Sequence, residues 1–172
     1  METQVILVDL EDNPVGTAEK AEAHRIPLLH RAFSIFLYHE NKLLIQQRAL
    51  KKYHSGGMWA NTCCSHPRPG EELAEAVARR LKEETGIVHH SLQPLFAFIY
   101  IYRFGENLYE YEYDHVFIGE YQGETAPDKE EIEELRWVDM DALLKDMVEA
   151  PGKYAPWFIA SAPKVVKHIR ER

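Results

Sequence analysis

Apolar residues recur every four positions in the stretch between Gly70 and Gly86. Leu73, Val77 and Leu81 would share one face of a helix, because a helical turn takes 3.6 residues. Gly86 follows this stretch in the position of a C-terminal glycine cap. The pattern predicts an amphipathic helix with one buried face.

Short apolar or alternating runs, bounded by turn residues, predict strands. The expected strands are Val5 to Leu10, Ala32 to Tyr38, Leu43 to Gln47, Leu95 to Tyr102, Leu108 to Gly119 and Leu135 to Val138. The second and third are separated by a short polar turn and are expected to form a hairpin. The fourth, LFAFIYIY, is almost entirely apolar and is expected to be buried.

Two more helical regions are expected near the C-terminus. One starts at Asp139 and runs through Val148, and the other runs from Pro156 to His168, with an interruption near Pro163. Strands, some of them in hairpins, together with about three helices predict an α/β (α+β) fold, in which a mixed β-sheet is sandwiched between helices. Residues 1–172 are expected to form a single domain.

Side chains in the predicted strand at residues 108–118, LYEYEYDHVFI, alternate between the two faces, and this alternation bears on function. Glu110 and Glu112 fall on the same face as Val116 and Ile118, so this face is expected to turn inward. Two like charges that face a core are costly unless a cation joins them. The alternative is that this face is solvated and the tyrosines point inward.

A metal ion would satisfy the two carboxylates. The candidate ligands are Glu110 and Glu112 with His24, His30 and His66. Imidazole nitrogen and carboxylate oxygen suit Mn²⁺, Zn²⁺, Fe²⁺ or, less typically, Mg²⁺. The chain contains nine histidines, so their number alone is weak support for a metal site.

Composition is that of an ordinary globular protein, with 45% hydrophobic and 28% charged residues. The net charge of −8 argues against general nucleic-acid binding, although a local basic cluster can still capture phosphate. Cys63 and Cys64 are adjacent and are interpreted as free thiols of a reducing compartment. We expect a cytoplasmic protein with no signal peptide and no membrane span.

The segment from Asn61 to Ile87 concentrates reactive groups. Cys63, Cys64 and His66 precede the predicted helix, which carries Arg80 and Glu84 four residues apart. On the helix alone, this pair would be an ordinary surface ion pair.

The same segment resembles the Nudix signature, a loop and helix whose carboxylates hold Mg²⁺ against a diphosphate. The matching residues are Glu71, Arg79, Leu81, Glu83, Glu84, Gly86 and Ile87. Two positions depart from the signature: Ser65 replaces its first glycine, and Arg80 replaces an acid that hydrolases normally need. Residues 61–67, NTCCSHP, resemble the active-site loop of the type I isopentenyl-diphosphate isomerases, a Nudix-fold family, and the likeness extends over nearly the whole chain.

This resemblance implies a particular site. The ligands of one divalent metal (Mn²⁺, Mg²⁺ or Zn²⁺) would be His24, His30, His66, Glu110 and Glu112. A second ion, Mg²⁺, would bridge the diphosphate to Glu84 and to the backbone of Cys64. The residues that bind substrate would be Lys20, Arg48, Lys52, Arg80 and Trp157.

The predicted reaction is the interconversion of isopentenyl and dimethylallyl diphosphate. Cys64 and Glu112 would exchange protons on opposite faces of the substrate, and Tyr100 would orient the glutamate. The expected partner is this small-molecule substrate, and the protein is expected to be a monomer, with a dimer as the alternative. The alternatives are a Nudix pyrophosphohydrolase and a non-catalytic zinc module, but the cysteines lack the C-x-x-C spacing of a structural zinc site.

Overall fold

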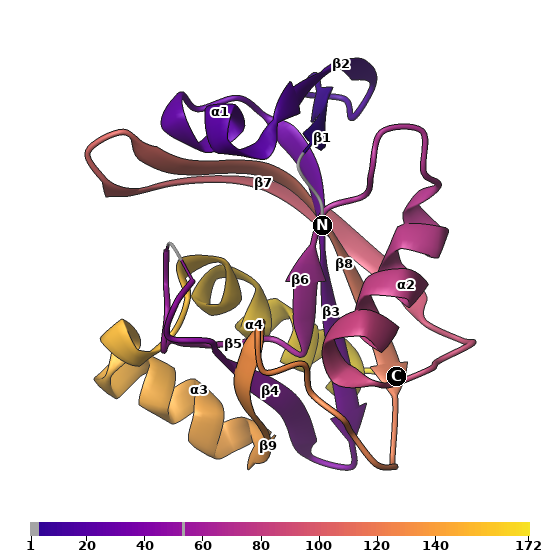
Figure 1. Ribbon diagram of the computed structural model, residues 1–172. Coiled ribbons are helices and arrows are strands. Elements are labelled where there is room, and N and C mark those ends of the chain that lie inside the picture. The colour runs from indigo at the N-terminus through magenta and orange to yellow at the C-terminus, as the bar shows by residue number, and fades with distance from the viewer. Residues whose placement is uncertain (1–3, 53) are drawn as a thin grey trace.

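The computed structural model describes residues 4–52 and 54–172 (Figure 1). The strands are β1 (Gln4–Val8), β2 (Pro14–Glu19), β3 (His30–His39), β4 (Lys42–Arg48), β5 (Trp59–Ala60), β6 (Cys63–Ser65), β7 (Gln93–Gly105), β8 (Leu108–Glu120) and β9 (Ile132–Asp139). The helices are α1 (Lys20–Arg25), α2 (Leu73–Thr85), α3 (Met140–Glu149), the short 3₁₀ turn η1 (Pro151–Lys153) and α4 (Pro156–Arg170).

Strand β3 is the centre of a mixed sheet. It pairs in parallel with β8 and antiparallel with β1, β4 and β6, while β7 extends the sheet beyond β8 and β9 pairs with β4. Most of β3 is buried, as expected for a strand covered on both faces. The expected hairpin of the second and third predicted strands is confirmed as β3–β4.

The two faces of the sheet support separate apolar clusters. On one face Phe33 and Leu37 pack with Val77 and Leu81 of α2, and on the other Phe36 packs in the cluster to which α3 and α4 contribute. Helix α2 lies on the side of the sheet opposite to α3 and α4 (Figure 1). The predicted sandwich of a mixed sheet between helices is therefore confirmed.

The boundaries of α2 follow the sequence signals closely. The helix ends at Thr85, and Gly86 adopts the left-handed conformation with φ of 76°. A Cβ atom at this position would lie 2.8 Å from Cβ of Ala126, so the close approach also requires glycine. Val77 and Leu81 are buried as predicted.

The prediction that residues 95–102 form a buried strand is wrong. The strand exists within β7, but Ile99 is 40% exposed and Ile101 is 57% exposed. The reason is that β7 is an edge strand, which among the described residues pairs with β8 alone. Its other face, which includes Phe98 and Tyr100, packs against the cluster beneath α4.

The predicted interruption near Pro163 is also wrong, because α4 continues through it. Pro163 removes one helical N–H donor, but its position is exposed, so water can satisfy the carbonyl group left without that donor.

Strand β2, helix α1 and the short strands β5 and β6 were not predicted; in particular, β6 lies within the expected loop of residues 61–67. Over the described residues, no helix combines the length and the apolar character needed to cross a membrane.

Candidate functional site

Residues that are far apart in the sequence converge on one cavity beside β3 and β8. Its lining residues are Lys20, His24, Phe33, Arg48, Lys52, His54, Cys64, Ser65, His66, Arg80, Glu110, Glu112, Glu131 and Trp157. Ten of these fourteen are among the site residues expected from the sequence. The cavity therefore gathers the predicted thiol, metal-binding groups and cations into one place.

The register of the parallel pair β3–β8 creates the acidic part of the site. His30, the first residue of β3, lies opposite Glu112, and alternation along β8 puts Glu110 and Glu112 on the same inward face. These carboxylates belong to residues that are only 3% and 8% exposed. The expectation that the glutamate face turns inward is confirmed.

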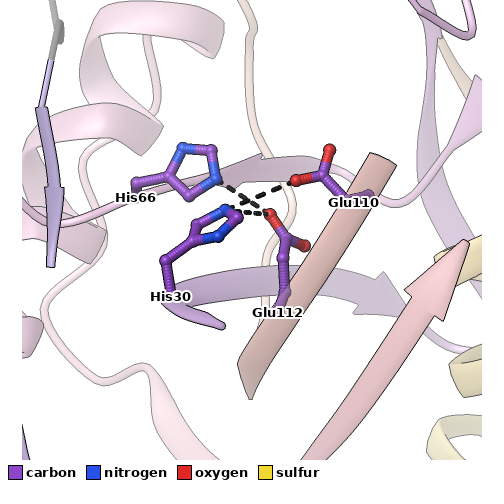
Figure 2. A group of neighbouring side chains, drawn as sticks. All are labelled: His30, His66, Glu110 and Glu112. Atoms are coloured by element: carbon purple, nitrogen blue, oxygen red, sulfur yellow. Dashed lines mark hydrogen bonds and ion pairs between the residues drawn. The ribbon is translucent and has the colours of Figure 1, made fainter. Parts of the chain in front are cut away.

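Four side chains meet at the centre of the site (Figure 2). His30 Nε2 lies 3.4 Å from Glu110 Oε1 and 3.5 Å from Glu112 Oε2, and His66 Nε2 lies 2.8 Å from Glu112 Oε2 (Figure 2). One potential ligand atom from each residue lies within 4.8 Å of the other three. This spacing suits a single metal ion.

Two more histidines flank Glu110. His24 Nε2 lies 2.8 Å from Oε1 of this carboxylate, and His54 Nε2 lies 2.9 Å from Oε2. Sequence reasoning identified His24 but missed His54. The only signal for His54 was its place just ahead of the Ser-Gly-Gly turn at residues 55–57, and such a turn is common without any function.

The hydrogen bonds of two histidines determine which ring nitrogen carries the proton. His24 Nδ1 lies 2.6 Å from the Lys20 carbonyl, and His30 Nδ1 lies 2.9 Å from that of Leu28. A carbonyl only accepts, so both rings donate from Nδ1 and turn an Nε2 lone pair toward the carboxylates. His30 Nε2 is buried with no hydrogen-bond partner among the described residues.

This arrangement fits a divalent metal. Backbone acceptors orient metal-binding histidines in the same way in many proteins, and two lone pairs that face carboxylate oxygens need a positive charge between them. Burial disfavours a charged His30, but the adjacent carboxylates of Glu110 and Glu112 outweigh burial and raise its pKa to about 10. Without a metal, a proton on His30 supplies the positive charge that the carboxylates require.

The pKa values of Glu110 and Glu112 shift in opposite directions, although both carboxyl groups are buried. Burial, followed by the charge of Glu110, raises the pKa of Glu112 well above its usual value. For Glu110, burial acts in the same direction, but its close contacts with His24, His30 and His54 outweigh it and hold its pKa well below the usual value. Glu112 is thus the carboxyl group of the pair that more readily holds a proton.

The two adjacent thiols point in opposite directions because they belong to strand β6. Cys63 is fully buried in the apolar cluster shared with α2, whereas Cys64 lines the cavity. Burial raises the pKa of Cys64 to about 12, although Arg48, whose Nη1 lies 3.9 Å from Sγ, opposes this shift. Cys64 therefore keeps its proton at neutral pH.

All four predicted substrate-binding cations line the cavity. Lys52 Nζ lies 2.5 Å from Glu131, and Arg80 Nη2 lies 2.6 Å from Glu84 and 3.7 Å from Glu131. Burial, with Lys52 nearby, lowers the pKa of Lys20. Glu131, which immediately precedes β9, was missed because its stretch, residues 128–134, reads as an acidic loop or a short turn.

The remaining predicted residues lie around this cavity. Trp157 Nε1 donates to Asn61 Oδ1 at 3.0 Å, and the Arg48 guanidinium lies 5.0 Å from the centre of the Trp157 ring. Glu84 is buried behind Arg80. Tyr100 pairs with Glu112 across β7–β8, and its hydroxyl has no hydrogen-bond partner within residues 4–52 and 54–172.

Comparison with known proteins shows which family this chain resembles. The NUDIX domain family matches residues 28–158. An isopentenyl-diphosphate Delta-isomerase of Burkholderia multivorans is 50% identical over 159 residues, which cover 92% of this chain and 90% of the relative. Isopentenyl-diphosphate Delta-isomerase 2 of Aromatoleum aromaticum is 48% identical over 167 residues, covering 96% and 88%.

Solved structures support the fold. DR0079 from Deinococcus radiodurans superposes with a TM-score of 0.75 at 20% identity, covering 96% of this chain and 98% of that one. A MutT protein from Methanosarcina mazei gives a TM-score of 0.63 at 19% identity, covering 84% and 96%. The identities to the curated relatives are far higher and extend over nearly the full length, so the chain belongs to the isopentenyl-diphosphate Delta-isomerase family of NUDIX-domain proteins.

Proposed function

We propose that this protein interconverts isopentenyl diphosphate and dimethylallyl diphosphate by a 1,3-proton shift. The observation that carries the proposal is that Cys64 and Glu112 line one cavity, beside a buried cluster of histidines and glutamates. The curated relatives, which carry the name of this activity, support the choice of substrate.

The chemistry demands a protonated group placed against the alkene carbon and a pocket poor in water. An unactivated alkene is a weak base, and protonating its terminal carbon uses the π electron pair and leaves a tertiary carbocation. Loss of a proton from the carbon on the other side of the cation then re-forms the double bond at the new position. Proton gain and proton loss balance, so no oxidant, reductant or water is consumed.

Cys64 and Glu112 are assigned to the two proton transfers. Cys64 retains its proton because burial raises its pKa, and the buried Glu112 also has a raised pKa. One group would act on each face of the planar cation. Tyr100, paired with Glu112 across the sheet, would orient that carboxyl group.

Five residues would hold a divalent metal beside the reacting carbons: His24, His30, His66, Glu110 and Glu112. When bound, Mn²⁺, Mg²⁺ or Zn²⁺ would neutralise the paired carboxylates and set the protonation of Glu112. Glu84 and the backbone of Cys64 would hold Mg²⁺ together with the diphosphate.

The diphosphate would be bound by Lys20, Arg48, Lys52 and Arg80, which line the same cavity. Arg80 and Lys52 contact Glu84 and Glu131 in the structure, so the substrate would exchange these contacts for phosphate oxygens. Trp157 would form the aromatic wall near the isoprenoid, where its ring face can stabilise developing positive charge.

Deuterium incorporation separates this reaction from the hydrolysis catalysed by other NUDIX proteins. In D₂O, the enzyme should place deuterium in the isoprenoid without releasing phosphate. Release of phosphate from a nucleoside diphosphate derivative, with no deuterium in the isoprenoid, would replace the proposal with a pyrophosphohydrolase. Arg80 stands where such a hydrolase keeps an acid, and this favours the isomerase.

We further propose that the enzyme acts as a cytoplasmic monomer. Free thiols at Cys63 and Cys64 suit a reducing compartment. Analytical ultracentrifugation at assay concentrations would test the oligomeric state.

A further inference from the structure

We propose that His54 is a positioning residue of the metal centre, which donates a hydrogen bond from Nε2 to Glu110 Oε2 and leaves Oε1 to face the metal. This inference deepens the proposed function and rests on the metal centre described above. Its subject is a residue that the sequence pattern did not identify.

The two oxygens of Glu110 have different neighbours. Oε1 lies 2.8 Å from His24 Nε2 and 3.4 Å from His30 Nε2, while Oε2 lies 2.9 Å from His54 Nε2. The first oxygen therefore faces the predicted ligands and the second faces His54. A carboxylate that binds a metal through one oxygen commonly accepts a hydrogen bond at the other.

The ring hydrogen bonds distinguish His54 from His24 and His30. Those two rings donate from Nδ1 to backbone carbonyls, which leaves their Nε2 atoms as lone-pair donors to a metal. His54 Nδ1 instead lies 3.3 Å from the hydroxyl of Ser55, a group that can donate to it. His54 Nε2 can therefore carry the proton that Glu110 Oε2 accepts.

Packing fixes the plane of the His54 ring. The ring stacks on Phe104 with centroids 4.4 Å apart at 20°, and its edge meets Trp157 at 5.9 Å and 88°. Phe104 belongs to the β7–β8 hairpin and Trp157 to α4, so distant parts of the chain hold the ring. Such a ring can orient a carboxylate, whereas a mobile surface histidine could not.

The turn after His54 has an unusual backbone conformation and little space around it. Ser55 and Gly57 have φ of 55° and 80°, and a Cβ atom on Gly56 would lie 2.6 Å from the Leu50 carbonyl oxygen. The His54 carbonyl accepts from Arg48 Nη2 at 3.4 Å. This residue thus links a predicted phosphate-binding arginine to the metal centre.

Two substitutions separate the hydrogen bond from the packing. His54→Phe keeps an aromatic ring beside Phe104 but removes the donor, and His54→Gln places an amide N–H near the position of Nε2 without the ring. His168→Phe is the matched control, because His168 also contacts a phenylalanine ring, that of Phe96, but lies outside the cavity.

The measurement is the dissociation constant for Mn²⁺ or Zn²⁺, obtained by competition with a chromophoric chelator, with circular dichroism as a check of folding. His54→Phe should weaken metal binding by about 10- to 100-fold, the usual effect of losing such a support. His54→Gln should recover most of the affinity, and His168→Phe should match the unaltered protein.

Substitution with Co²⁺ distinguishes a positioning role from direct ligation. If His54 acts through Glu110, the visible absorption of the cobalt protein should keep its shape in His54→Gln. A changed spectrum in His54→Gln, together with metal loss as severe as in His54→Phe, would make His54 a ligand and overturn the proposal. Unchanged metal affinity in His54→Phe would also overturn it. Failure of the unaltered, metal-loaded protein to isomerise substrate would refute the proposed function and leave this result intact.

Discussion

At the scale of single residues, strand alternation separates two chemically identical thiols. Cys64 faces the cavity and Cys63 faces the core, so only Cys64 can reach a substrate. Cys64→Ala should lower kcat by at least about 100-fold, the contribution typical of one positioned acid or base. Cys64→Ser should retain little activity, because a hydroxyl is a far weaker acid than a thiol.

Cys63→Ala is the matched control for that prediction. It removes a buried sulfur from the cluster beneath α2, so it should lower the melting temperature while most of the activity remains. Steady-state kinetics of the three variants provide the measurement. Full activity in Cys64→Ala would mean that the thiol is not part of the chemistry.

Glu110 is the residue on which the metal centre most depends, since three histidines contact it. Glu110→Gln keeps the shape but removes the charge, so metal affinity should fall by more than the roughly 10- to 100-fold cost of losing an outer support. Elemental analysis of protein purified without chelator would measure this. Glu120→Gln, an exposed change on the same strand, should keep the metal, and normal metal content in Glu110→Gln would refute the assignment.

At the scale of elements, α2 carries Arg80 and Glu84 on one side, in contact at 2.6 Å. If both serve the diphosphate, Arg80→Ala should raise KM by about 10- to 100-fold, the cost of losing a charge-assisted hydrogen bond. Glu84→Gln should raise the Mg²⁺ concentration needed for half-maximal rate. Glu75→Gln, an exposed change on the same helix and outside the cavity, is the control and should leave both quantities unchanged.

The outcome of that experiment distinguishes two roles for one ion pair. Unchanged kinetics with a lower melting temperature in both variants would mean that Arg80 and Glu84 only stabilise the helix. The ion pair is partly shielded from solvent, and Glu131 lies 3.7 Å from Arg80. Both substitutions should therefore lower the stability of the protein, whichever role the pair has. Kinetics, rather than stability, therefore decide between them.

Periodicity along the sequence correctly predicted those features that depend on the strand or helix alone. The face of β8 that carries Glu110 and Glu112 was predicted because alternation is a property of the strand itself. The exposure of β7 was not, because an apolar run does not reveal whether a strand lies at the edge of a sheet. His54 and Glu131 escaped prediction for a related reason: both lie outside regular elements, and only the fold brings them to the cavity.

At the scale of the whole molecule, the metal centre joins parts of the chain that are far apart in sequence. His24 comes from α1, His30 from β3, His66 follows β6, and both glutamates come from β8. An ion bound to all of them would connect the N-terminal region to the central sheet. It would also remove the repulsion between two carboxylates buried side by side.

Metal binding should therefore stabilise the whole fold. A ligand at about 1,000 times its dissociation constant stabilises the folded state by about 4 kcal/mol, which corresponds to a rise in Tm of about 10 °C for a protein of this size. Dialysis against chelator should lower Tm by a similar amount, and returning Mn²⁺ or Zn²⁺ should restore it, as measured by scanning calorimetry. Glu110→Gln should melt at the same temperature with and without chelator, because it lacks the carboxylate that joins the histidines. A Tm that is indifferent to chelator in the unaltered protein, despite full metal removal, would show that the fold forms without help from the ion.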